Sequence, residues 1–152
     1  MLKQIRQILT FNRKAGLLDL PYNPMKEAEY CIEEALEGFD TTYLANKLHL
    51  HEDATPKDLS RAIVTGCCKL PDEGLPEVDA FDKHLDGIVF NFGALFKLNL
   101  TIPAIFRGLE SVMIANLTKL IVGKDEHGKQ MKPEGFVGPE IELQKILDER
   151  RN

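Results

Sequence analysis

The chain has 152 residues, of which 43% are hydrophobic and 28% charged, and its formal net charge is −5. This length suits one domain with a buried core, and the composition is too apolar for a disordered chain. The acidic balance argues against binding to a nucleic-acid polymer, which requires a basic surface. It does not argue against a nucleotide enzyme, because metal ions can neutralise local carboxylates.

The apolar residues recur mostly at helical spacing, which predicts a succession of helices. Those between Leu2 and Leu9 mark a first helix, which Gly16 closes. A second helix is expected from about Pro24 into the late forties. The dipeptide Thr55-Pro56 is typical of a capping residue followed by a first-turn proline, and it predicts the start of a third helix.

The second half of the chain continues this pattern after a Pro- and Gly-containing loop at residues 71–76. A fourth helix is expected from about Glu77 to Asn99, and Thr101 is placed to cap a fifth. The polar, Gly- and Pro-rich segment 123–138 predicts a long functional loop, and a last helix is expected from Pro139. Because no strand is equally clear, we expect an all-α helical bundle.

The three cysteines, Cys31, Cys67 and Cys68, bear on the compartment. Their odd number and the lack of a Cys-x-x-Cys pair predict reduced, buried thiols, which are typical of a cytoplasmic protein. Residues 1–20 lack the apolar run of a signal peptide, and no stretch has the ~20 apolar residues that a membrane span requires. We therefore expect a cytoplasmic protein that does not bind a membrane.

Two groups of carboxylates have the spacing of a helix face. They are Glu33, Glu34 and Glu37 in the second predicted helix, and Asp79, Asp82 and Asp86 in the fourth. A solvated acidic face is the ordinary explanation of such a group. However, the aspartate stripe continues into Val89, Phe90 and Gly93, which we expect in the interior of the bundle, and carboxylates entering an interior must be paired or metal-bound.

The chemistry of these side chains favours one class of metal. Hard carboxylate oxygens suit Mg²⁺ or Mn²⁺, and these ions in turn suit phosphate chemistry. A di-iron bundle also uses inward-facing carboxylates, but it needs Glu-x-x-His pairs on two helices. None of the four histidines has a glutamate three residues before it, which excludes that alternative.

The EExxE motif at residues 33–37, followed by Asp82-x-x-x-Asp86 and an apolar helix end at residues 97–100, resembles the MazG-like, all-α NTP pyrophosphatase superfamily. That family pairs an EExxE helix with a later ExxD helix, and the four carboxylates hold Mg²⁺. Asp86 matches the aspartate of the second motif, whereas Lys83 occupies the position of its glutamate. Asp82 offers a carboxylate four residues before Asp86 instead, and we infer that it substitutes.

Residues 115–119, 125–129 and 132–136 resemble the phosphoribosyl-ATP-pyrophosphatase-like branch of this superfamily. In that branch an N-x-[ST]-K helix end and a lysine-bearing loop contact the nucleotide. The implied substrate-binding residues are Asn116, Lys119 and Lys129, with Lys132 ranked below them. The whole resemblance covers roughly residues 25–145.

The resemblance implies Mg²⁺-dependent hydrolysis of an NTP or dNTP between the α- and β-phosphates, giving a monophosphate and pyrophosphate. The implied metal ligands are Glu34, Glu37, Asp82 and Asp86, with Mn²⁺ as the alternative ion. Glu33 or Glu34 would act as the catalytic base that accepts a proton from the attacking water. Helix geometry places Glu33 and Glu37 nearer the apolar face, whereas the family motif favours Glu34 with Glu37, so both alternatives stay open.

The resemblance also bears on assembly and on cellular role. Family members pair to complete their four-helix cores, so a homodimer or homotetramer of one domain, residues 1–152, is implied. The implied role is house-cleaning of the nucleotide pool. Two alternatives remain: a non-catalytic helical interaction protein, which Lys83 in the motif keeps open, and a narrow dUTPase-like or phosphoribosyl-ATP-specific pyrophosphatase.

Overall fold

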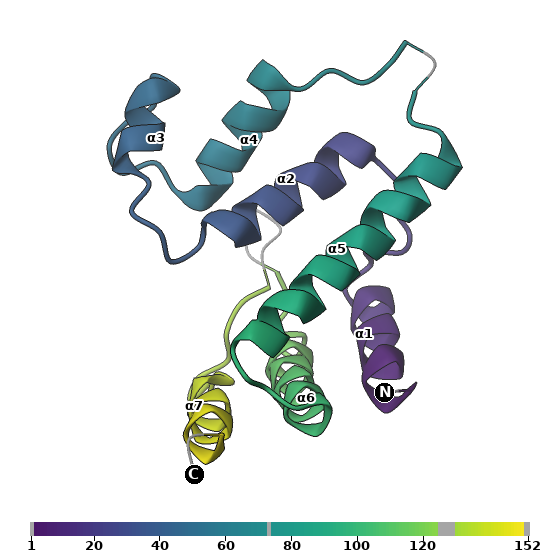
Figure 1. Cartoon of the computed structure of the whole chain (residues 1–152), viewed down its shortest axis with the longest axis vertical. Helices are drawn as coiled ribbons and strands as arrows, with labels where there is room; N and C mark the ends of the chain where they lie inside the picture. The colour runs from purple at the N-terminus through teal and green to yellow at the C-terminus, as the bar shows by residue number, and fades with distance from the viewer. Residues whose placement is uncertain (1, 73, 125–129, 151–152) are drawn as a thin grey trace. The chain divides into compact units, whose positions relative to one another are not determined.

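The computed structural model describes residues 2–72, 74–124 and 130–150. Within these residues the chain is all-helical apart from an isolated antiparallel bridge between Lys124 and Gln130, which confirms the predicted fold class. The helices are α1 (Leu2–Lys14), α2 (Pro24–Leu36), α3 (Thr42–Lys47), α4 (Pro56–Cys67), α5 (Glu77–Lys97), α6 (Ile102–Lys119) and α7 (Glu140–Glu149) (Figure 1).

The chain forms two compact units. The central unit is Pro21–Asp86, and the terminal unit combines Met1–Leu20 with Gly87–Asn152, so the boundary falls inside α5. The main helix packing within the central unit is α2 against α4, and within the terminal unit it is α6 against α1 and α7 (Figure 1). The four-helix core and the extent of a single domain therefore stay predictions.

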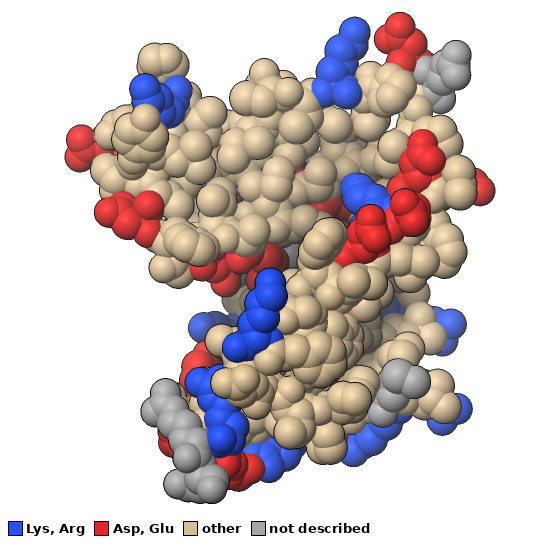
Figure 2. All heavy atoms as spheres, in the orientation of Figure 1, with Lys and Arg blue, Asp and Glu red and all other residues tan. Residues whose placement is uncertain are grey.

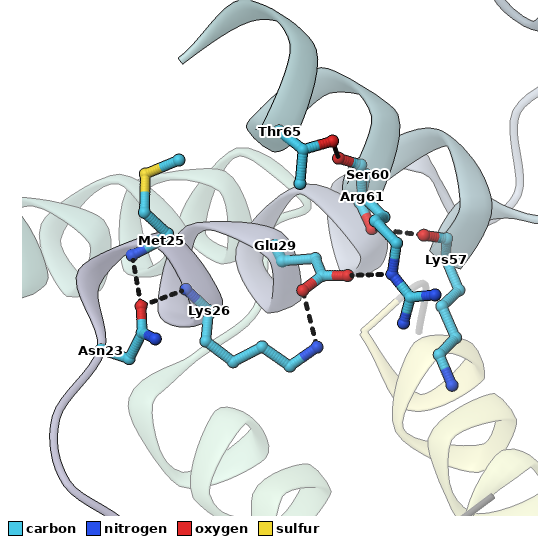
Figure 3. Close-up of polar contacts among 8 residues, drawn as sticks. All are labelled: Asn23, Met25, Lys26, Glu29, Lys57, Ser60, Arg61 and Thr65. Atoms are coloured by element: carbon cyan, nitrogen blue, oxygen red, sulfur yellow. Dashed lines mark hydrogen bonds and ion pairs between the residues drawn. The ribbon is translucent and has the colours of Figure 1, made fainter. Parts of the chain in front are cut away.

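The start of α2 follows from its capping residue. The Asn23 side-chain oxygen accepts hydrogen bonds from the backbone N–H groups of Met25 and Lys26, both at 3.1 Å, and Pro24 occupies the first turn (Figure 3). This arrangement satisfies two of the four N–H groups that a helix start leaves without partners.

The expectation that this helix continues into the late forties is wrong. It ends at Leu36. The next two residues have backbone angles outside the helical range, since Glu37 adopts a ψ of 134° and Gly38 a φ of 83°. A separate short helix, α3, then begins at Thr42. The apolar spacing of the sequence continues across this break and therefore does not predict it.

An ion pair between the buried carboxylate of Glu29 and the more exposed Arg61 joins α2 to α4 (Figure 3). Glu29 is only 8% exposed, and its carboxylate accepts from the Lys26 ammonium at 2.6 Å and from Arg61 Nε at 3.2 Å. The hydrogen bond from Lys26, and with it the contact to Arg61, lowers the pKa of Glu29 although burial acts in the opposite direction. Because Glu29 and Lys26 lie on α2 and Arg61 on α4, the contact between Glu29 and Arg61 links the two helices.

The predicted start of the helix at Pro56 is confirmed. Thr55 and Asp58 form a capping box in which each side chain accepts from the backbone N–H of the other. Leu59 and Val64 of this helix are buried. In contrast, all three cysteines are exposed, so the expectation of buried thiols is wrong.

In the terminal unit, α6 packs against both α1 and α7. Its predicted capping residue, Thr101, is also confirmed. The Thr101 hydroxyl accepts from the N–H of Ala104 at 3.4 Å. Gly108 faces α7 so closely that a Cβ built on it would lie 3.2 Å from Leu143 Cδ2. Arg107 then pairs with Glu142 at 3.0 Å and with Glu149 at 2.8 Å on the surface of the same contact.

No single helix of the part of the chain described here is long and apolar enough to cross a membrane. The helices α5 and α6 reach that length and composition only when taken together, and a sharp bend separates them.

Candidate metal and phosphate sites

The three glutamates of the first motif lie at the C-terminal end of α2. Glu33 is half-buried, whereas Glu34 and Glu37 are exposed. Glu37 is the residue that ends the helix, with a φ of −59° and a ψ of 134°. The φ angle sets the direction of the Cβ, and the φ of Glu37 is helical, so its side chain points as it would from a helical residue. The non-helical ψ then turns the following backbone away from the helix axis. The motif therefore keeps its helical spacing despite the early end of α2.

The aspartates of the second group lie on the first half of α5. Asp79, Asp82 and Asp86 are all exposed, and they belong to the same central unit as the glutamates. The continuation of their stripe is exposed as well: Val89 is 65% and Phe90 75% accessible. The expectation that this stripe enters the interior of the bundle is therefore wrong for the single chain, because both side chains are exposed in the described part of the chain.

The two acidic groups are separate features of the central unit. Figure 2 shows red side chains beneath the C-terminal end of α2 and over the first half of α5. Among residues 2–72, 74–124 and 130–150, no three His, Cys, Asp or Glu side chains converge closely enough to hold a metal ion. Binding of Mg²⁺ by Glu34, Glu37, Asp82 and Asp86 thus stays a prediction.

The charge of the chain is unevenly divided between the units. The central unit contains 15 acidic and six basic residues, a formal charge of −9. The terminal unit contains nine acidic and 13 basic residues, a formal charge of +4. The net negative charge of the whole chain therefore includes one unit that is positively charged. A divalent cation would be attracted to the central unit and an anionic ligand to the terminal unit.

The two described substrate-binding candidates lie together near the C-terminal end of α6. The Lys119 ammonium donates a hydrogen bond to Asn116 Oδ1 at 3.1 Å, and both side chains are half-buried. Since the amide oxygen faces Lys119, the two N–H donors of Asn116 point away from it. Lys129, the third candidate, lies outside the residues that the structure describes.

The sequence interpretation missed a role for Phe136. Its ring centroid lies 5.5 Å from the Lys119 ammonium and 5.6 Å from the Lys132 ammonium. Lys132, ranked lowest among the lysines, therefore shares a partner with Lys119. The segment Lys132-Pro133-Glu134-Gly135-Phe136 contained the signal, but spacing within a loop does not predict which side chains meet.

Backbone contacts hold the loop before Phe136 to the end of α6. Lys124 pairs with Gln130 in the isolated bridge, and the N–H of Met131 donates to the carbonyl of Gly123 at 2.9 Å. The Lys124 ammonium also donates to the carbonyl of Ala15 at 2.8 Å. These contacts join Gly123 and Lys124 to Gln130 and Met131, and join Lys124 to the residue that follows α1.

No protein family, curated protein or solved structure matches this chain. The case for a function therefore depends on the residues, their order and the contacts described above.

Proposed function

We propose that the chain is a Mg²⁺-dependent nucleoside triphosphate pyrophosphohydrolase that releases a monophosphate and pyrophosphate. The observation that carries the proposal is the concentration of both carboxylate motifs in one unit of formal charge −9. Within the described ranges, Glu33, Glu37, Asp82 and Asp86 have no cationic side chain paired with them. Like charges on one face repel each other, and a divalent cation would offset that repulsion.

The donor set fits the proposed ion. Glu34, Glu37, Asp82 and Asp86 would hold it through hard carboxylate oxygens, which Mg²⁺ prefers. When bound, Mg²⁺ would neutralise phosphate charge and promote ionisation of the attacking water. Glu33 or Glu34 would accept the proton of that water, whose oxygen bonds to phosphorus while the bond between the α- and β-phosphates breaks and pyrophosphate leaves.

The terminal unit would supply the contacts to the triphosphate. Asn116 offers two amide donors, and Lys119 offers an ammonium group whose only described polar partner is the Asn116 oxygen. These groups stabilise charge on the phosphate oxygens without contacting the metal. Separate variants of the carboxylates and of these donors test the two sets individually.

We propose self-association as part of the same function. Large apolar side chains on α5 are exposed in the single chain, including Phe81 at 66%, Val89 at 65% and Phe90 at 75%. Exposed apolar groups of this size along one helix are typical of an interaction surface. Pairing of two copies through the side of α5 that carries Val89 and Phe90 would cover these two side chains and complete a four-helix core.

The enzyme proposal is tested with a panel of NTPs and dNTPs in the presence of Mg²⁺, with pyrophosphate and orthophosphate measured separately. Glu37→Gln and Asp86→Asn should each reduce turnover by about 100-fold or more, because each removes one charged metal ligand. Asp53→Asn is the matched control, since that aspartate is 85% exposed and outside both motifs. Circular dichroism should give the same helix content for all variants.

Two outcomes would contradict this proposal. One is release of orthophosphate alone by the wild type, and the other is full activity of Glu37→Gln. Inactivity of the wild type on the whole panel would favour the second candidate, a non-catalytic helical interaction protein. The specific observation behind that candidate is Lys83, a cation at the position where the family motif has a metal-binding glutamate.

A further inference from the structure

Phe136 is the meeting point of two lysines from different parts of the terminal unit. Lys119 comes from the end of α6 and Lys132 from the following loop, and both ammonium groups lie within 5.6 Å of the ring centroid. The ring itself is half-buried. Its contacts therefore keep the two ammonium groups within about 11 Å of each other, although the lysines are separated by a loop in the sequence.

Whether a lysine keeps its net positive charge depends on whether its partner is an aromatic ring or a carboxylate. An aromatic ring attracts an ammonium group through its quadrupole, by about 0.5–2 kcal/mol, but it carries no net charge. A carboxylate in its place would neutralise the lysine. In the described part of the chain neither Lys119 nor Lys132 forms an ion pair with an acidic side chain. The ring therefore brings two positive charges together and leaves both of them available to an anion.

The neighbouring groups favour a phosphate chain as that anion. Asn116 directs its oxygen to Lys119, which leaves two amide N–H donors for phosphate oxygens. Lysine ammonium groups act on phosphates as compact point charges. Two such charges beside one ring match an anion whose charge is spread over several phosphates better than they match a single phosphate. The formal charge of +4 on the terminal unit adds to this attraction.

We propose that Phe136 is a positioning residue that holds Lys119 and Lys132 for the polyphosphate chain of a nucleoside triphosphate. This inference rests on the proposed function for the identity of its ligand. It adds Lys132 to the proposed substrate-binding residues and assigns the ring of Phe136 the role of positioning both lysines. Phe136 does not touch the phosphates in this proposal, so its effect on them passes through the two lysines.

The test uses the full chain and inorganic tripolyphosphate, titrated calorimetrically in EDTA so that the carboxylates cannot contribute through a metal. Phe136→Leu keeps an apolar side chain but removes the ring, and Phe136→Tyr keeps the ring. We expect Phe136→Leu and Lys132→Ala to weaken binding by about tenfold, a change within the range of a lost cation–π contact. Phe136→Tyr should bind as the wild type does, as should the control Lys145→Ala, which removes an exposed lysine of the same unit.

Kinetics give a second measurement. With the nucleotide substrate, Phe136→Leu should raise KM about tenfold and leave kcat nearly unchanged, because binding contacts are lost and the metal ligands stay. Equal binding by Phe136→Leu and wild type would overturn the inference, and so would a failure of Phe136→Tyr to restore binding. If Phe136→Leu does not fold, unchanged binding by Lys132→Ala overturns it equally.

These outcomes are separable from those of the enzyme proposal. A wild type that binds tripolyphosphate with the expected variant effects but hydrolyses no nucleotide would disprove the proposed function and support the phosphate site. A wild type that hydrolyses nucleotides while Lys132→Ala and Phe136→Leu bind normally would support the function and overturn the site.

Discussion

Glu29 is the residue whose charge connects α2 to α4. Its carboxylate is nearly buried and depends on Lys26 and Arg61 to compensate for the loss of hydration. Removing the charge leaves both cations without their partner. We expect Glu29→Gln to lower the free energy of unfolding at pH 7 by about 1–3 kcal/mol, as measured by urea denaturation.

The same residue gives the protein a predicted acid sensitivity. The contacts to Lys26 and Arg61 hold the pKa of Glu29 below its ordinary value in the folded chain, so the unfolded chain takes up the proton at the higher pH. The stabilisation is therefore complete above the ordinary pKa of a glutamate and is lost as the pH falls through the lowered one. Unfolding curves of the wild type and Glu29→Gln should converge below that pH.

The control for Glu29 is the exposed pair of His51 and Asp53, whose side chains are each 85% accessible. Asp53→Asn should change the free energy of unfolding by less than about 1 kcal/mol, because an exposed pair is well hydrated. A loss as large as that of Glu29→Gln would show that burial does not decide the strength of these pairs.

At the scale of the helices, two glycines differ in what surrounds them: Gly108 lies on a face of α6 that α7 covers, and Gly93 lies on an open face of α5. Apart from its chain neighbours and the backbone of its own helix, a Cβ built on Gly93 of α5 meets no described atom within 4 Å, whereas one built on Gly108 of α6 lies 3.2 Å from Leu143 and 3.7 Å from Ile146. Gly108 thus permits α7 to approach α6 closely. Both glycines lie inside helices, where alanine has the higher helix propensity.

We predict opposite effects for substitutions at these positions. In dilute protein, Gly93→Ala should raise the free energy of unfolding by up to about 1 kcal/mol, because alanine has the higher helix propensity and its methyl group causes no clash. Gly108→Val should lower it by about 1–3 kcal/mol, because the added methyl groups overpack the α6–α7 contact. Thermal unfolding of the two variants measures both. A stabilised Gly108→Val would show that α7 moves away at little cost.

At the scale of the whole molecule, the exposed apolar face of α5 predicts association. Phe90→Glu places a charge where a second copy would contact the helix, and a buried unpaired charge strongly disfavours an interface. Light scattering should give at least twice the chain mass of 17.2 kDa for the wild type and about that mass for the variant.

A matched change elsewhere distinguishes this effect from a general increase in charge. Tyr43 on α3 is 74% exposed, nearly as much as Phe90, and does not lie on α5. Tyr43→Glu should leave the oligomer intact. A wild type that is monomeric at every concentration and still hydrolyses nucleotides would contradict the idea that pairing completes the site.

Local chemistry made several features of the fold predictable. The helix start at Pro56 was predicted from a capping side chain and a first-turn proline, and the start near Ile102 from the capping residue Thr101, because such groups act through the nearest backbone N–H groups. The start near Pro24 was predicted from apolar spacing. The end of α5 near Asn99 follows a similar local rule, since that residue adopts a φ of 57° after the last helical turn. The candidate carboxylates could be found in the same way, because spacing of three and four residues is a property of one helix.

Long-range packing decided the rest. The spacing of apolar residues identified Val89 and Phe90 as part of an apolar helix face, but it did not predict that they are exposed. Burial depends on which other segment packs on that face, and the spacing within one helix does not specify this. The ion pair of buried Glu29 with Arg61 was not predicted, since its members lie 32 residues apart. The sequence by itself thus determined the helical class, the caps and the acidic faces, which depend on neighbouring residues. Only the tertiary structure placed Lys119 and Lys132 on Phe136, because side chains from a helix and a loop meet only after the chain has packed.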